Sequence, residues 1–70
     1  MTAEQIDNWF SYHRPTPEQQ AAYEHLRAKA KEFAHALNDV APESADKTAA
    51  MRKLRECVMT ANAAIACGGR

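Results

Sequence analysis

Apolar residues recur at alternating spacings of three and four along most of this 70-residue chain, and they form two long stripes. The first stripe consists of Tyr23, Leu26, Ala30, Phe33, Leu37 and Val40. The second consists of Met51, Leu54, Val58, Ala61 and Ile65. Because this spacing keeps one face of a helix apolar, the pattern predicts two long amphipathic helices. No stretch alternates with a period of two, so strands are not expected.

Helix start signals divide the chain into three helices. Thr2-Ala3-Glu4-Gln5 and Thr16-Pro17-Glu18-Gln19 have the capping-box pattern, in which a hydroxyl and a glutamine amide satisfy backbone N–H groups. Ser44 is the expected cap of the third helix, which the glycines at 68 and 69 should end.

The first of these helices is short. It carries Ile6, Trp9 and Phe10 on one face. We expect it to end near Ser11, because Pro15 disfavours a helical conformation at the residue before it.

The connection between the two long helices, at residues 40–44, is short enough to make them antiparallel neighbours. The predicted fold is therefore all-α: one domain over residues 1–70, with a short N-terminal helix folded against an antiparallel helical hairpin. The chain is short for a self-sufficient core. Its many alanines leave more apolar surface than one partner helix covers, so we expect a homo-oligomer larger than a dimer.

Charge and cysteine content narrow the function classes. Nine basic and nine acidic residues give no net charge, which argues against binding DNA or RNA polymers but not against a small anionic ligand. Cys57 and Cys67 lie too far apart on one predicted helix to pair, and free thiols fit a reducing cytosol. No apolar run reaches the roughly 20 residues that cross a bilayer, and no signal-peptide pattern opens the chain.

The spacing of polar residues supports neither a metal site nor catalysis. His13, His25 and His35 lack zinc-like spacing, and no Cys-x-x-Cys pair occurs. The only glycines lie at the end of the chain, so there is no phosphate-binding loop. We expect a protein that is not an enzyme and needs no metal or cofactor.

The stretch Phe10-Ser11-Tyr12-His13-Arg14-Pro15 is not explained by the hairpin. A ring that stacks on a base and a guanidinium that grips phosphate are what a nucleotide ligand needs. Arg27, near the edge of the apolar stripe, can be presented to this stretch of a neighbouring protomer in an oligomer. Two structural alternatives remain: Tyr12 seals the short helix, and Arg27 forms a surface ion pair with Glu24.

Three segments together resemble a known phage family. They are Phe10-x-Tyr12-His13-x-Pro15, the helix around Tyr23-Glu24-x-x-Arg27-Ala28-Lys29-Ala30-Lys31, and Lys53-Leu54-x-Glu56-x-Val58-Met59-x-Ala61-Asn62-Ala63-Ala64-Ile65-Ala66. The resemblance is to the small helical-hairpin family of phage anti-CBASS proteins, which are cyclic-oligonucleotide sponges. A related hairpin domain occurs in anti-Thoeris sponges.

The resemblance implies a non-enzymatic protein that binds cyclic dinucleotide immune signals of the cyclic GMP–AMP kind. It would withhold them from their effector in the cytoplasm of the infected bacterial host. The resemblance also implies a homohexamer with dinucleotide pockets between protomers and separate pockets for cyclic trinucleotides.

Carried over residue by residue, Tyr12 matches the family's base-stacking tyrosine. Arg27 stands where the family has a phosphate-gripping lysine, which keeps the charge but adds a bidentate geometry. His13 and Arg14 belong to the same matched stretch and complete the predicted cyclic-dinucleotide site.

A second nucleotide site is predicted at Lys53, with Arg52 beside it. The sequence departs from the family pattern at Thr60, where close relatives often carry tryptophan; this bears on the oligomer interface and on the trinucleotide pocket.

Two alternative hypotheses assign the chain to other classes of function. One is a helical adaptor or antitoxin-like module that docks another protein, and the other is a nucleotide-degrading enzyme, against which the missing metal-ligand spacing argues.

Overall fold

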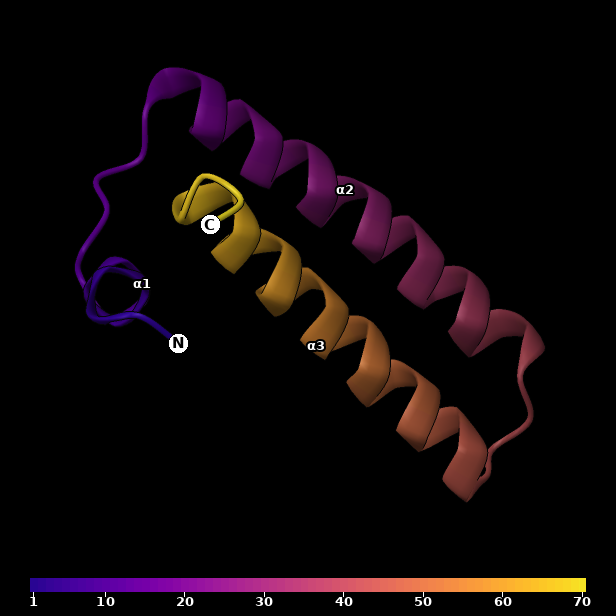
Figure 1. The fold of residues 1–70 in the computed structure, drawn as a ribbon. Coiled ribbons are helices and arrows are strands. Elements are labelled where there is room, and N and C mark those ends of the chain that lie inside the picture. Colours follow the sequence, from indigo (N-terminus) through magenta and orange to yellow (C-terminus); the bar gives the residue numbers. More distant parts are fainter.

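The computed structural model of residues 1–70 contains three helices, α1 (Ala3–Trp9), α2 (Pro17–Val40) and α3 (Ala45–Ala66), and no strand. α2 and α3 lie side by side and antiparallel, and α1 lies near the open end of this hairpin (Figure 1). The molecule measures 45 × 28 × 15 Å, so it is a thin slab. The predicted all-α hairpin with a short N-terminal helix is confirmed.

The predicted helix caps are all present. The Thr2 hydroxyl accepts a hydrogen bond from the Gln5 backbone N–H (3.1 Å), and the Gln5 side chain accepts one from the Thr2 N–H (2.8 Å). Thr16 and Gln19 repeat this reciprocal pair at the start of α2. Ser44 caps α3 through a single bond to the N–H at position 47. Each cap satisfies N–H groups that the helix itself leaves without acceptors.

The ends of α1 and α3 differ from one another. α1 ends at Trp9, two residues before the predicted end. α3 is followed by Gly68 and Gly69 with φ of 67° and 76°, a left-handed conformation that glycine adopts without steric cost. Their N–H groups donate to carbonyls in the last turns of α3, and the chain turns back toward α1 (Figure 1).

The seam of the hairpin is made of half-buried side chains, among them Leu26 and Leu37 of α2 and Leu54, Val58 and Ile65 of α3. The predicted stripe on α2 is wrong at two positions. Phe33 and Val40 are 57% and 81% exposed, and the alanines that follow them, at positions 34 and 41, are half-buried instead. Adjacent helix positions point about 100° apart, and alanine lets two helices approach closely, so Ala34 occupies the seam in place of Phe33. Ala41 follows the end of α2, with an extended backbone.

The turn of the hairpin is closed by Lys47. Its ammonium donates to the Asn38 carbonyl (3.0 Å) and pairs with the Glu43 carboxylate (2.6 Å), and its side chain is only 10% exposed. The lysine therefore links the end of α2, the connection and the first turn of α3.

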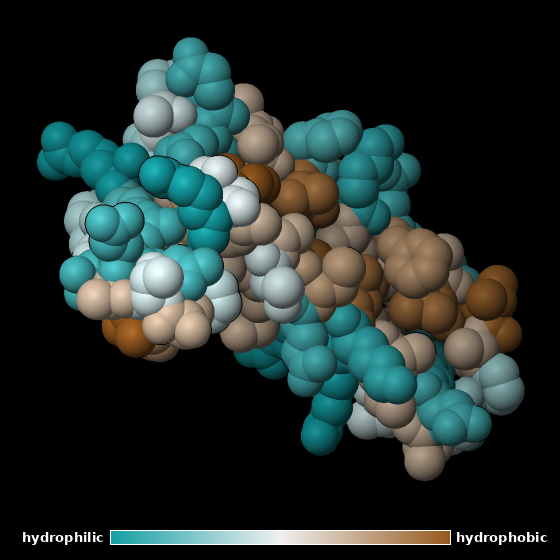
Figure 2. All heavy atoms as spheres, in the orientation of Figure 1, coloured by the Kyte–Doolittle hydropathy of each residue, from teal (hydrophilic) through white to brown (hydrophobic).

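No residue of the single chain is fully buried. Figure 2 shows apolar side chains running along the hairpin between hydrophilic flanks, and several large ones are exposed. A two-helix layer of this size cannot enclose a core, so one copy leaves uncovered the kind of surface that marks an interaction site.

None of the three helices combines the length and the apolar character that a bilayer-spanning segment requires.

Candidate functional site

The connector between α1 and α2 carries Tyr12, His13 and Arg14, and it is held against the end of α1. The last four carbonyls of a helix have no partners within the helix. In α1, three of these four carbonyls accept hydrogen bonds from the connector. The donors are the Phe10 N–H to Ile6 O (3.0 Å), the Ser11 hydroxyl to Asp7 O, and the His13 ring Nε2 to Asn8 O (2.5 Å).

The end of α1 is in turn fastened to the end of α3. The Asn8 side-chain amide donates to the Cys67 carbonyl (3.2 Å), and the Trp9 indole N–H donates to the Arg70 carbonyl (2.8 Å). The thiol of Cys67 lies 3.9 Å from Asn8 O. Sequence reasoning missed Asn8, because an asparagine near a helix end fits no spacing pattern and its partner lies 59 residues away.

Tyr12 is 85% exposed and makes no hydrogen bond. The alternative in which Tyr12 seals the short helix is therefore wrong for the single chain. Its neighbour Arg14 is also exposed and forms no ion pair. The connector thus carries an exposed aromatic ring and, two residues further on, an exposed guanidinium without an ion pair.

Arg27 is exposed on α2 and does not pair with Glu24. The ion pairs of the protein are Lys29–Glu32 (3.3 Å) and Lys47–Glu43 (2.6 Å), so the expected Arg27–Glu24 pair is not formed. Arg27 lies about 15 Å along α2 from its first residue, whereas Tyr12 precedes the helix. One chain therefore does not bring the two side chains together.

Arg52 and Lys53 are exposed in α3, toward the closed end of the hairpin. The register of the hairpin is marked by Gln19, whose side-chain amide donates to the Ile65 carbonyl (3.1 Å). Measured from this level, Arg27 lies about 12 Å along the hairpin and the Arg52–Lys53 pair about 18–20 Å. The Arg52–Lys53 pair therefore lies only about 6–8 Å further along the hairpin than Arg27, and Arg52 and Lys53 themselves point about 100° apart.

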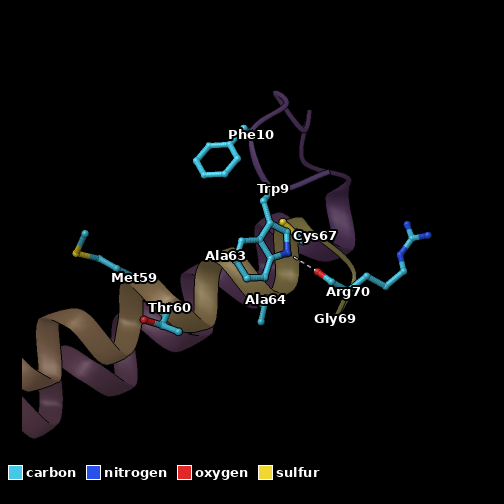
Figure 3. Close-up of a pocket in the computed structure, with 9 residues that line it drawn as sticks. All are labelled: Trp9, Phe10, Met59, Thr60, Ala63, Ala64, Cys67, Gly69 and Arg70. Carbon is cyan, nitrogen blue, oxygen red and sulfur yellow. Dashed lines mark hydrogen bonds between the residues drawn. The ribbon is translucent and has the colours of Figure 1, made fainter. Parts of the chain in front are cut away.

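A groove of about 610 Å³ lies between the end of α1 and α3. Figure 3 shows the Trp9 indole over this part of α3, with its N–H on the Arg70 carbonyl, and Phe10 and Met59 on the open side. The Arg70 guanidinium, the only charged side chain of the lining residues, points away from the groove. Sequence reasoning missed this groove, although it noted Thr60, which is one of its lining residues. Its apolar lining suits hydrophobic side chains better than phosphates.

No group of three or more His, Cys, Asp or Glu side chains is arranged to hold a metal ion. His25 and His35 are exposed along α2, and both cysteines are free thiols.

Comparison with known proteins gives one result. A family model described as Acb2/Tad1, hairpin domain, matches residues 2–66, which include all three helices. The curated proteins and the solved structures contain no match. The resemblance seen in the sequence is confirmed: the chain belongs to the Acb2/Tad1 hairpin-domain family, the anti-CBASS and anti-Thoeris sponges, which bind cyclic nucleotides and are not enzymes.

Proposed function

We propose that this protein is a sponge for cyclic dinucleotides of the cyclic GMP–AMP kind. It binds the signal in the cytoplasm of the infected bacterial host and keeps it from its effector. The observation that carries the proposal is the pair of unengaged side chains at the matched positions: an exposed Tyr12 ring and an Arg27 guanidinium without an ion pair.

The chemistry of these two groups is complementary to such a ligand. A base stacks on the Tyr12 ring, which is sequence-tolerant because every base has a π-face. Arg27 donates two hydrogen bonds to a phosphate in its planar fork geometry. Arg14 adds positive charge to the same site, and the outward face of His13 borders it.

Binding alone is sufficient for the activity. Free signal falls below the dissociation constant of the effector when enough sites are present, and no turnover is required. Each site removes one ligand molecule, so protection is stoichiometric, and a slow dissociation rate makes it durable.

The site is divided between copies of the chain. Tyr12 of one protomer and Arg27 of another would flank the ligand, since a single chain holds them far apart. We infer a homo-oligomer, with a hexamer as the expected assembly, in which a neighbour covers the groove lined by Trp9, Phe10 and Met59. Arg52 and Lys53 supply the cations of a second site for cyclic trinucleotides.

Titration calorimetry with cyclic GMP–AMP and with cyclic trinucleotides tests this proposal. Each complex is then heat-denatured, and the released nucleotide is analysed by chromatography. We expect saturable dinucleotide binding and full recovery of the intact cyclic molecule. Linear dinucleotide that accumulates with time would instead establish an enzyme. An absence of any heat of binding, with no nucleotide released on denaturation, would contradict the sponge.

A second candidate function, a helical adaptor, is favoured by one observation. The apolar groove beside Trp9 is open in the single chain and could accept a helix of another protein. Light scattering of the pure protein separates the two: a self-assembled particle covers its apolar surface without a foreign partner, whereas an adaptor remains small.

A further inference from the structure

We propose that His13 is a positioning residue: its ring holds the connector on the end of α1 and thereby sets where Tyr12 stands. This inference rests on the proposed stacking role of Tyr12. In this role the Nε2 atom of the His13 ring bonds to the protein itself and does not contact the ligand.

The hydrogen bond of the His13 ring determines which nitrogen carries the proton. Nε2 lies 2.5 Å from the Asn8 carbonyl oxygen, and a carbonyl oxygen can only accept. Nε2 must therefore be protonated in the free protein, and it is already engaged before any ligand arrives. The ring is half-buried, which is consistent with a residue that serves the fold of the connector.

The acceptor of this bond is itself fixed. Asn8 donates from its side chain to the Cys67 carbonyl (3.2 Å), so the bond from His13 reaches through Asn8 to the end of α3. A movement of the connector relative to the hairpin would break one of these two bonds. His13 therefore ties the connector to the rest of the molecule, not only to α1.

Tyr12 is bracketed by two such attachments. On one side the Ser11 hydroxyl donates to Asp7 O, and on the other the His13 ring donates to Asn8 O. The Tyr12 side chain is 85% exposed and makes no hydrogen bond of its own. Its position is thus determined by its neighbours, and a ligand gains affinity when the residue it stacks on does not have to be ordered on binding.

The experiment compares His13→Ala with His13→Gln, a neutral variant whose side-chain amide can still donate to Asn8 O. Cyclic GMP–AMP affinity, particle mass and melting temperature are measured for both. We expect His13→Ala to bind about five- to tenfold more weakly with unchanged mass, and His13→Gln to recover most of the loss. His25→Ala is the control, because His25 is exposed and makes no hydrogen bond; its affinity should equal that of the wild type.

Ring ¹⁵N NMR of the free protein gives an independent readout. We expect the Nε2–H tautomer at His13. We also expect no change in the Nε2 signal when ligand is added, because Nε2 stays hydrogen-bonded to the Asn8 carbonyl oxygen. An Nδ1–H tautomer, an Nε2 signal that moves on binding, or a His13→Gln variant as weak as His13→Ala would overturn the positioning role.

The calorimetry also separates this inference from the proposed function. Wild-type protein that binds no cyclic dinucleotide contradicts the sponge, and the positioning role falls with it. Wild-type binding together with an unaltered affinity of His13→Ala contradicts the positioning role alone.

Discussion

Tyr12 and Arg27 are informative because neither side chain forms a hydrogen bond or an ion pair within its own chain. A large ring that is 85% exposed contributes little to folding, so its removal should leave the melting temperature unchanged. Tyr12→Ala should nevertheless weaken cyclic dinucleotide binding by tenfold or more, since stacking contributes about 1–3 kcal/mol per base. Tyr12→Phe keeps the ring and should bind within about twofold of wild type. A drop in melting temperature without a change in affinity would return Tyr12 to a structural role.

The prediction for Arg27 is of a different kind, because its proposed contact with a ligand phosphate is Coulombic. Arg27→Ala should lose about 1.5–3 kcal/mol of binding free energy, or roughly tenfold or more in affinity. Arg27→Lys should retain part of this, as lysine keeps the charge without the fork. Added salt should reduce the Arg27 contribution but not the Tyr12 contribution. Equal salt dependence of wild type and Arg27→Ala would exclude a phosphate contact at this position.

Residue identity and the family resemblance single out Tyr12 and Arg27 as the predicted site, which stays a prediction, and they do not describe the surroundings of either residue. The Arg27–Glu24 pair was a reasonable expectation at i, i+3, yet exposed charges on a helix gain little from pairing and this pair does not form. Asn8 could not be predicted at all. Its importance comes from a hydrogen bond to Cys67, and no local pattern encodes a partner that distant.

Among the helices, the caps were predictable because they are local. Each capping box involves only four consecutive residues, and both boxes form as expected, at Thr2 and at Thr16. The face of α2 that enters the seam was only partly predictable. Phe33 and Val40 are apolar and correctly spaced, but a hairpin has a single partner helix, and Leu26, Ala30 and Leu37 already fill that side. The pattern cannot tell a seam from an apolar flank.

The cap of α2 can be tested directly. Thr16→Ala removes the oxygen that accepts the Gln19 N–H, and it should lower the free energy of unfolding by about 1 kcal/mol. Thr16→Asp keeps an acceptor at the positive end of the helix and should be close to wild type. Urea unfolding followed by circular dichroism measures both. Thr48→Ala serves as the comparison, since Thr48 lies within α3 outside the groove and its hydroxyl accepts no helix N–H; a loss equal to that of Thr16→Ala would show that capping is not the cause.

For the assembled protein, the decisive feature is that no residue of one copy is fully buried. We expect a particle of several times 7.8 kDa, because association would bury apolar surface that a single hairpin leaves in water. Ala63→Glu puts a charge into the groove beside Trp9 and should dissociate the particle. Ala28→Glu adds the same charge on α2, outside the groove, and should not. Light scattering that finds a folded monomer at micromolar concentration would contradict the assembly.

The hairpin as a whole followed from the short connection between two long apolar stripes. The groove did not, because it exists only where α1 meets the end of α3. That meeting depends on Trp9 and Asn8 bonding to carbonyls 61 and 59 residues away, and on the turn at the two glycines. Local sequence predicts elements and their immediate connections, whereas the surfaces made between distant elements depend on contacts that have no local signature.

The attachment of α1 also bears on the order in which this molecule opens. The hairpin closes across a short connection, whereas α1 has seven residues and depends on contacts made across most of the chain. Short helices have little stability alone, and distant contacts carry the greatest loop-closure entropy. The unit of α1 and the connector should therefore form last and detach first, while the hairpin stays intact. Amide protons of α1 should exchange faster than those of the hairpin, and bound ligand should slow them, because a ligand stacked on Tyr12 binds only the attached state.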